Sequence, residues 1–461
     1  MNGHESKPAS GRGQRGYSLI ELMIAITLGM LLSLGIATLF TNTNNTYRSQ
    51  DAIARLQENG RFAISRMVDD IRSGFAQPLA TAVNAKTQQS TPNGIVVPPM
   101  APDVYVADLE TYLPRWAPIP TGTVVRPTGW PVGTIYPFSP RWLLQGFECS
   151  VTGSSCNPTV PSWAPPVGTT AGSRVQGGDV LTLRFISAQG WSMVRAGGSY
   201  AACNSGRTTT TAIHVLPSTD EPPNNFVPGD IALVWKNDRG FIFKTGGTSG
   251  VLLPVDMVQP SVTLPCLASA QNESIVLYNL SRDLRTITYF LQLVADPNPD
   301  ATPGRVVPTL MRVEGNNPPE AVASGVERLD FLYGVEGRDG RLRFLSADQV
   351  HSDEGANGVN CNNPPEQYGD LPKPAPPLSA MEPGCLWRSV RTIEVHLLLN
   401  TINDNQALLT ADRAYRYSVN GGTVTYAAPV VPGASMPNGL VPGYMMRREF
   451  TAQVTLRNNI P

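Results

Sequence analysis

One carboxylate, Glu21, stands near the start of an otherwise apolar segment, four residues after Tyr17. An ionised carboxylate inside a bilayer costs at least a few kcal/mol, so an acid in such a segment marks a functional site. The small residue Gly16 precedes the apolar segment, whereas an ordinary secretory signal has its small residues after it. Cleavage between Gly16 and Tyr17 would free an amine one helical turn from Glu21. In an apolar assembly, the acid of one subunit can pair with the amine of the next and set their register.

Six cysteines lie beyond this apolar segment, and none belongs to a C-x-x-C pair. An even number of cysteines in an exported protein indicates disulfides. The alternative is a zinc site, against which the irregular spacing and the few histidines argue. The spacing does not fix the pairing. We predict that neighbours along the chain pair: Cys149 with Cys156, Cys203 with Cys266, and Cys361 with Cys385.

Few other residues form a chemical motif. Asp296 and Asp300 flank a turn that could hold Ca²⁺, but the glycine and distal glutamate of a calcium loop are missing, so a plain turn is favoured. His214 and His396 lie in strand-like segments, which favours structural roles. Residues 11–16 match G-x-G-x-x-G but follow no strand. Because H-E-x-x-H, G-x-S-x-G and P-loop motifs are absent from the sequence, we expect no enzymatic activity, cofactor or metal.

The apolar segment that follows Glu21 is expected to place this residue in a membrane. Residues 22–40 carry no charge and, at ~1.5 Å per residue, span roughly 28 Å, close to the hydrocarbon thickness of a bilayer. The cations Lys7, Arg12 and Arg15 precede this segment. They favour a cytoplasmic N-terminus, with the rest of the chain exported.

A second helical pattern extends over residues 51–72. Its apolar positions recur every three to four residues, with Gly60 in the widest interval, and its charges lie on the opposite face. We therefore expect one long helix over 17–72, whose second half packs on a globular body, with a soft joint at 41–47. The apolar positions are Ile53, Leu56, Ala63, Met67 and Ile71.

Residues 77–178 lack sustained periodicity and are rich in proline. Proline is excluded from helix interiors and central strands. Two interpretations remain open: an exposed arm that binds another protein through its aromatic residues, or short strands and turns with tryptophan in the core, which we favour. This segment contains Trp116, Trp130, Trp142 and Trp163.

Alternating apolar and polar residues predict a series of strands after residue 178. One long helix followed by strands predicts an α+β fold, with the helix on one face of an antiparallel sheet. We divide the chain into a leader over 1–16, the helix over 17–72, and a body over 73–461. The expected strands cover 179–186, 229–235, 239–244, 274–278, 285–294, 309–313, 325–335, 390–399 and 449–456, the second and third forming a hairpin.

The start of the mature chain resembles a known family. Gly16 and Tyr17, followed by Ser-Leu-Ile-Glu-Leu-Met-Ile-Ala, are similar to the class III signal of type IV pilins and type II secretion pseudopilins. The resemblance implies that a prepilin peptidase cuts after Gly16 and methylates Tyr17, and that Glu21 governs assembly. Two departures are tyrosine where phenylalanine is commoner and the lack of a helix proline. An unrelated signal anchor is the alternative.

Further segments resemble minor pilins of the PilW family in particular. They are Ala54-Arg-Leu-Gln-Glu-Asn-Gly-Arg-Phe-Ala63 in the helix, and 288–291, 309–312, 325–334 and 447–458 in the strand region. The resemblance does not cover the arm at 77–178 or the loop at 350–385.

This resemblance implies a minor pilin that primes type IV pilus assembly and is located at the filament tip. Its implied partners are the major pilin, other minor pilins, the prepilin peptidase and a PilY-type adhesin, which links it to adhesion and twitching motility. It would reside first in the inner membrane with a periplasmic body. That body is too bulky to repeat along a close-packed filament, which favours the tip.

Two other functions remain open. A large pseudopilin of a type II secretion system has the same start, and a membrane-anchored periplasmic enzyme would need a cleft that the sequence does not predict. Composition excludes another class: 35 lysines and arginines balance 36 acids, so we expect no nucleic-acid partner. Abundant glycine and proline with 15% charged residues fit a loop-rich, exported β protein.

Overall fold

In the computed structural model, the described residues start at Ser18 and include the long helix and most strands of the body. The structure describes residues 18–74, 103–104, 106, 143–151, 153–187, 190–192, 201–206, 208–214, 226–236, 239–246, 252–254, 264, 266–267, 275–296, 304–336, 341–352, 385–388, 390–403, 415–419, 423–428, 440, 443 and 445–456.

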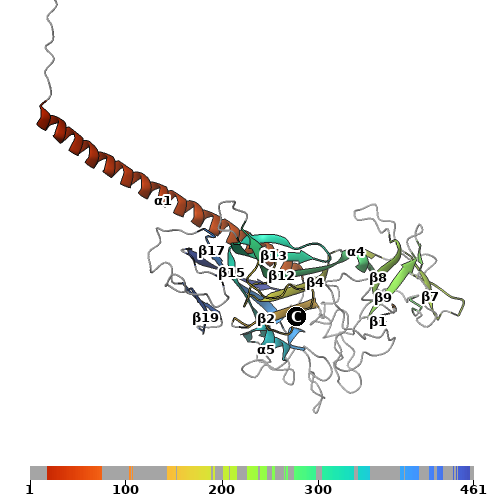
Figure 1. Cartoon of the computed structure of the whole chain (residues 1–461). Helices are drawn as coiled ribbons and strands as arrows, with labels where there is room; N and C mark the ends of the chain where they lie inside the picture. Colours follow the sequence, from red (N-terminus) through yellow and green to blue (C-terminus); the bar gives the residue numbers. More distant parts are fainter. Residues whose placement is uncertain are drawn as a thin grey trace, which may run out of the picture.

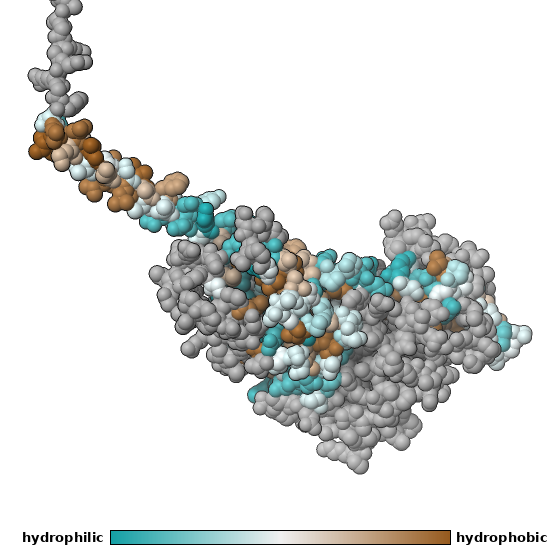
Figure 2. All heavy atoms as spheres, viewed as in Figure 1, coloured by the Kyte–Doolittle hydropathy of each residue, from teal (hydrophilic) through white to brown (hydrophobic). Residues whose placement is uncertain are grey.

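Helix α1 (Leu19–Ser73) is a single helix of 55 residues. Its first half projects away from the body (Figure 1), and its apolar side chains are exposed on every face (Figure 2). Its second half is docked, with Leu56, Ala63, Met67 and Ile71 buried. The amphipathic pattern therefore predicted the docked face correctly. The expected soft joint at 41–47 is regular helix.

Two antiparallel sheets form the body around α1. The first has six strands in the order β14 (Glu320–Ser324), β13 (Val306–Glu314), β12 (Leu284–Ala295), β4 (Val180–Ile186), β2 (Leu144–Cys149) and β3 (Cys156–Asn157). The second has four strands in the order β16 (Leu342–Leu345), β15 (Val326–Glu336), β17 (Val390–Asn400) and β20 (Arg447–Thr455).

The main core lies where the docked half of α1 meets both sheets. Met67 and Ile71 of the helix belong to one buried cluster with Leu183 and Leu291 of the six-stranded sheet and Leu397 of the four-stranded sheet. Strands β4, β15 and β17 are buried along nearly their whole length because both of their faces are covered. A hairpin of β18 (Tyr415–Val419) and β19 (Thr423–Ala428) lies beside the second sheet. The short helices α5 (Ala347–His351) and α7 (Cys385–Arg388) pack together, and α5 contacts β2 and β15.

Residues 187–283, here called the inserted unit, leave the six-stranded sheet between two neighbouring strands, β4 and β12. They build their own core and lie at the end of the body away from the exposed helix (Figure 1). One of the unit's sheets has the strand order β9 (Arg239–Gly246), β8 (Pro228–Lys236), β11 (Ile275–Asn279) and β5 (Trp191–Ser192), and β1 (Asp103–Val104), from outside the unit, pairs in parallel with β9. The second sheet of the unit has three strands in the order β10 (Leu252–Pro254), β7 (Thr210–His214) and β6 (Ala201–Cys203). Helix α4 (Leu280–Asp283) then leads the chain back into β12.

The α+β architecture is the one expected, and each expected strand is present with its ends shifted by a few residues. Within 77–178, the described residues agree with the favoured interpretation of short strands and turns and not with an exposed arm, because β2 is an inner strand of the main sheet. Its later part, 161–178, packs against β12 through hydrogen bonds such as Val175 N to Leu291 O at 3.0 Å. This part of the segment is therefore short strands and turns. Trp163 is half-buried there, while Trp116, Trp130 and Trp142 lie outside the described residues.

Candidate assembly site

Glu21 lies in the first turn of α1, where a negative charge interacts favourably with the positive end of the helix dipole. The side chain is exposed on a helix that is long and apolar enough, by length and composition, to cross a membrane. Within the described part of the chain, no side chain forms an ion pair or hydrogen bond with it. Gly16 and Tyr17 lie outside the described residues.

The other polar side chains of the apolar half behave differently from Glu21. The Thr27 hydroxyl donates to the Met23 carbonyl at 3.0 Å, and the Thr38 hydroxyl donates to the Gly35 carbonyl at 2.9 Å. These threonines satisfy their hydroxyls within the helix, which suits an apolar environment. A carboxylate has no proton to donate to such carbonyls, so Glu21 gains nothing from this arrangement.

Asp70 fixes the other end of α1 to the six-stranded sheet. Its Oδ2 accepts hydrogen bonds from the Tyr289 hydroxyl at 2.5 Å and from Arg312 Nε at 2.7 Å. Burial and the Asp70 carboxylate raise the pKa of Tyr289, so the phenol stays protonated and donates. Burial opposes the charge of Arg312, but its bonds to Asp70 and Glu314 outweigh that cost and raise its pKa. These contacts set the direction in which α1 leaves the body.

A glycine permits the close packing of α1 on the second sheet. A Cβ atom at Gly60 would lie 2.4 Å from the ring of Phe450 on β20, which is far inside van der Waals contact. The interval in the apolar pattern at Gly60 is therefore a point where the helix needs a residue without a side chain to accommodate Phe450.

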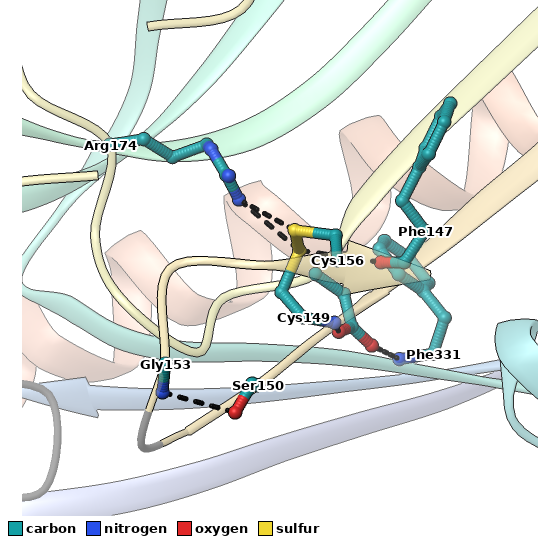
Figure 3. Close-up of a disulfide and its surroundings, with 8 residues drawn as sticks. Phe147, Cys149, Ser150, Gly153, Cys156, Arg174 and Phe331 are labelled. Carbon is teal, nitrogen blue, oxygen red and sulfur yellow. Dashed lines mark hydrogen bonds between the residues drawn. A yellow bond between two sulfur atoms is a disulfide. The ribbon is translucent and has the colours of Figure 1, made fainter. Parts of the chain in front are cut away.

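Two of the three expected disulfides are present. Cys149 and Cys156 are directly opposite each other on β2 and β3 (Figure 3), and Cys203 pairs with Cys266 in the inserted unit. The expected pair of Cys361 with Cys385 lies outside the described residues, since Cys361 and the side chain of Cys385 are not described.

Three carboxylates lie beside the first disulfide, and the sequence did not reveal them: Asp179 and Asp330 are buried, and Glu148 is half-buried. Asp179 accepts hydrogen bonds from the backbone amides of Cys149 at 2.9 Å and Phe331 at 3.1 Å. Asp330 accepts from Arg328 and from the Tyr417 hydroxyl. Burial, followed by the Asp330 charge, raises the pKa of Glu148 to about 7. Burial also raises the pKa of Asp179 well above its usual value.

The remaining candidate residues have structural surroundings. His396 lies on β17 between Glu394 and Glu449, with nitrogen–oxygen distances of 3.1 and 3.0 Å. His214 is half-buried at the end of β7. The Asp296 carboxylate pairs with Arg305 at 3.2 Å, and Asp300 lies outside the described residues. Among the described side chains, no three His, Cys, Asp or Glu residues gather as they would to hold a metal ion.

Comparison with known families matches the two regions described above. Residues 11–37 match the prokaryotic N-terminal methylation motif, which contains Gly16, Tyr17 and Glu21. Residues 298–458 match the type IV pilus-assembly protein W family, PilW, and include the strands from β13 to β20. No curated protein matches the chain. No solved structure matches it either. With the long apolar helix in front of an antiparallel body, these matches support a type IV pilin-like protein and are consistent with the PilW type.

Proposed function

We propose that this protein is a minor pilin that primes type IV pilus assembly and resides at the filament tip. One observation carries the proposal: Glu21 is exposed on an apolar helix, within a matched methylation motif, and without a partner among the described residues of its own chain. Such a carboxylate is stable in an apolar filament when it pairs with the N-terminal amine of a neighbouring subunit. The match to a pilus-assembly family favours a pilus over a secretion pseudopilus.

The proposed life cycle follows from the shape of the molecule. Before assembly, α1 anchors the protein in the inner membrane and the body lies in the periplasm. Prepilin peptidase removes residues 1–16 and methylates Tyr17. The mature helix then packs with the major pilin and other minor pilins, and the body and its inserted unit project at the tip. There they support a PilY-type adhesin, and through it adhesion and twitching motility. The proposed role is structural and needs no enzymatic activity.

The test replaces Glu21 by glutamine, which keeps the shape of the side chain and removes its charge. Removing one partner of a buried ion pair costs about 3 kcal/mol or more. We therefore expect Glu21→Gln protein to insert in the membrane normally and to fall at least about tenfold in sheared pili, measured by quantitative immunoblot. Thr27→Ala, in the same apolar segment, is the matched control and should be incorporated normally.

Mass spectrometry of the membrane fraction separates assembly from processing. Both variants should begin at N-methyl-Tyr17. Normal incorporation of Glu21→Gln into pili would contradict the proposed role of this carboxylate, and an unprocessed Met1 in the wild-type protein would contradict the prepilin assignment itself.

A further inference from the structure

Arg174 lies against the disulfide of Cys149 and Cys156. Its Nη1 is 3.2 Å from Cys149 Sγ and 3.3 Å from Cys156 Sγ, and Figure 3 shows the extended side chain reaching both sulfurs. The residue is 4% exposed. The loop backbone holds it in place, because Arg174 N donates to the Pro166 carbonyl at 2.9 Å and Gly168 N donates to the Arg174 carbonyl at 3.2 Å. The guanidinium is therefore directed at the sulfurs by the fold.

A disulfide is a poor partner for a buried cation. Its neutral sulfurs accept hydrogen bonds only weakly, whereas a guanidinium is best compensated by an anion. Arg174 Nε also has no hydrogen-bond partner among the described atoms. Burial lowers the pKa of Arg174 in spite of the nearby Asp179 carboxylate. The oxidised state therefore leaves the charge of Arg174 incompletely compensated.

Reduction would supply the missing anion. Reduction would break the bond and let the two sulfurs separate, and a thiolate at either one could accept a hydrogen bond from Arg174 Nη1, which lies 3.2 and 3.3 Å from the two sulfurs of the disulfide. The sulfurs otherwise lie among apolar side chains and near a carboxylate, since Cys149 belongs to a buried cluster with Phe147, Phe290 and Met311 and its backbone amide donates to Asp179 at 2.9 Å. Apolar surroundings alone raise a thiol pKa and make a cysteine inert, while an adjacent arginine lowers it and makes the cysteine reactive.

The body can tolerate opening of this bond. β2 remains paired with β4, and the amide of Cys149 remains bonded to Asp179 at 2.9 Å. Opening the bond therefore removes the covalent link between β2 and β3 and leaves the pairing of β2 with β4 unbroken.

We propose that Cys149 and Cys156 form a redox-exchangeable disulfide, whose partner is a dithiol reductant or a dithiol oxidoreductase, and that Arg174 is the positioning residue that stabilises its reduced form. This exchange site is independent of the proposed assembly role of Glu21.

The exchange begins at Cys156, which is half-buried, whereas Cys149 is 5% exposed. A thiolate of the dithiol attacks Cys156 Sγ, the bond between the two protein sulfurs breaks, and Cys149 leaves as a thiolate beside Arg174. The second thiol of the dithiol, after losing its proton to solvent, displaces Cys156 Sγ from the mixed disulfide. The protein gains two electrons and the dithiol becomes a disulfide. A leaving sulfur with a lower pKa departs faster, so Arg174 promotes the first step.

The test uses the full-length protein in detergent, equilibrated with mixtures of reduced and oxidised dithiothreitol. Free thiols are trapped by alkylation, and mass spectrometry quantifies both disulfides in the same sample. We expect Cys149–Cys156 to be reduced at a dithiol-to-disulfide ratio at least tenfold lower than Cys203–Cys266. Arg174→Gln should raise the ratio needed for Cys149–Cys156 at least tenfold, a shift of about 30 mV. Arg174→Lys should restore most of the change.

A second measurement reports the thiolate directly. In protein selectively reduced at this bond, the rate of Cys156 alkylation is followed against pH, and we expect its midpoint below the ordinary thiol value of about 8.5. Arg174→Gln should move this midpoint upward. Arg285→Gln, the same substitution at a residue on β12 whose guanidinium pairs with Glu314, is the control and should move neither quantity.

Two outcomes overturn the proposal. One is a wild-type alkylation midpoint at or above the ordinary thiol value. The other is a folded Arg174→Gln protein with unchanged redox ratio and midpoint. If Arg174→Gln does not fold, its Cys203–Cys266 bond will be reduced more easily than in the wild-type protein. In that case the alkylation midpoint of Cys156 in the wild-type protein decides whether the proposal stands.

Discussion

Asp70 connects α1 to the six-stranded sheet through Tyr289 on β12 and Arg312 on β13. The side chain of Arg312 is 6% exposed, so its charge depends on nearby acids for compensation. Glu314 and Glu320 supply part of it, and Asp70 supplies the part that reaches from the helix. One carboxylate thus joins the long apolar helix to the strand-rich body.

We expect Asp70→Asn to lower the free energy of unfolding of the full-length protein in detergent by about 3 kcal/mol, because it removes one partner of a buried ion pair. Urea unfolding followed by near-ultraviolet circular dichroism measures the change. The exposed neighbour Asp69 provides a matched control, and Asp69→Asn should stay within about 0.5 kcal/mol of wild type. Equal effects of the two variants would show that the Asp70 contact does not hold the helix.

Glu148 links the stability of the body to pH. Its pKa is about 7 in the folded protein and 4.5 as an ordinary glutamate, so between these values the folded state holds a proton that the unfolded state has released. The free energy of unfolding therefore falls as the pH rises through this interval, by up to roughly 1.4 kcal/mol per pH unit.

Glu148→Gln should reduce this loss, because glutamine does not titrate. We expect the melting temperature of the variant to fall less than that of wild type between pH 4.5 and about pH 7. Glu58→Gln, at an exposed position on α1, should retain the wild-type slope. Parallel curves for Glu148→Gln and wild type would rule out Glu148 as the titrating group.

At the scale of elements, α1 was predictable because its two halves follow simple rules. The apolar half shows an uninterrupted run, and the docked half repeats apolar residues with helical spacing. Strands such as β12 and β17 were predictable from their apolar content. Strand β2 was missed because it follows a proline-rich stretch, and only its pairing with β4 shows that it belongs to the sheet.

Gly60 tests the docking of α1 as an element. Gly60→Leu should lower the free energy of unfolding of the body by about 1–3 kcal/mol, because the new side chain must displace Phe450. Gly29 is the matched control, since no atom lies within 4 Å of a Cβ built there. Gly29→Leu should leave urea unfolding of the body unchanged. A neutral effect of Gly60→Leu would mean that helix and strand can separate without cost.

At the scale of the whole molecule, the inserted unit is distinct from the pilin-like body. It has its own core and the Cys203–Cys266 disulfide, and it lies outside the region that matches the PilW family. Its base is narrow: Ser187 N donates to the Asp283 carbonyl at 2.9 Å, directly beside the paired residues Ile186 and Leu284. The six-stranded sheet therefore does not require the inserted unit for its own pairing.

Replacing residues 188–282 by Asn-Gly should convert β4 and β12 into a two-residue hairpin. We expect the shortened protein to fold, with Cys149–Cys156 formed and the near-ultraviolet spectrum of the remaining body retained. A two-residue variant with Pro-Pro in place of Asn-Gly should fold poorly, because it cannot form this turn. Aggregation of both variants would mean that the inserted unit is an integral part of the core.

The sequence by itself determined the features that depend on neighbours along the chain. They include the spacing of Gly16, Tyr17 and Glu21, the two halves of α1, and most strands, because helix and strand periodicity and membrane solvation are local properties. The tertiary structure decided which distant residues meet. Asp70 reaches partners 219 and 242 residues away, and Arg174 reaches two sulfurs in the preceding hairpin. Burial then shifts the pKa values of Glu148 and Tyr289 upward and that of Arg174 downward, and no local pattern encodes burial of that kind.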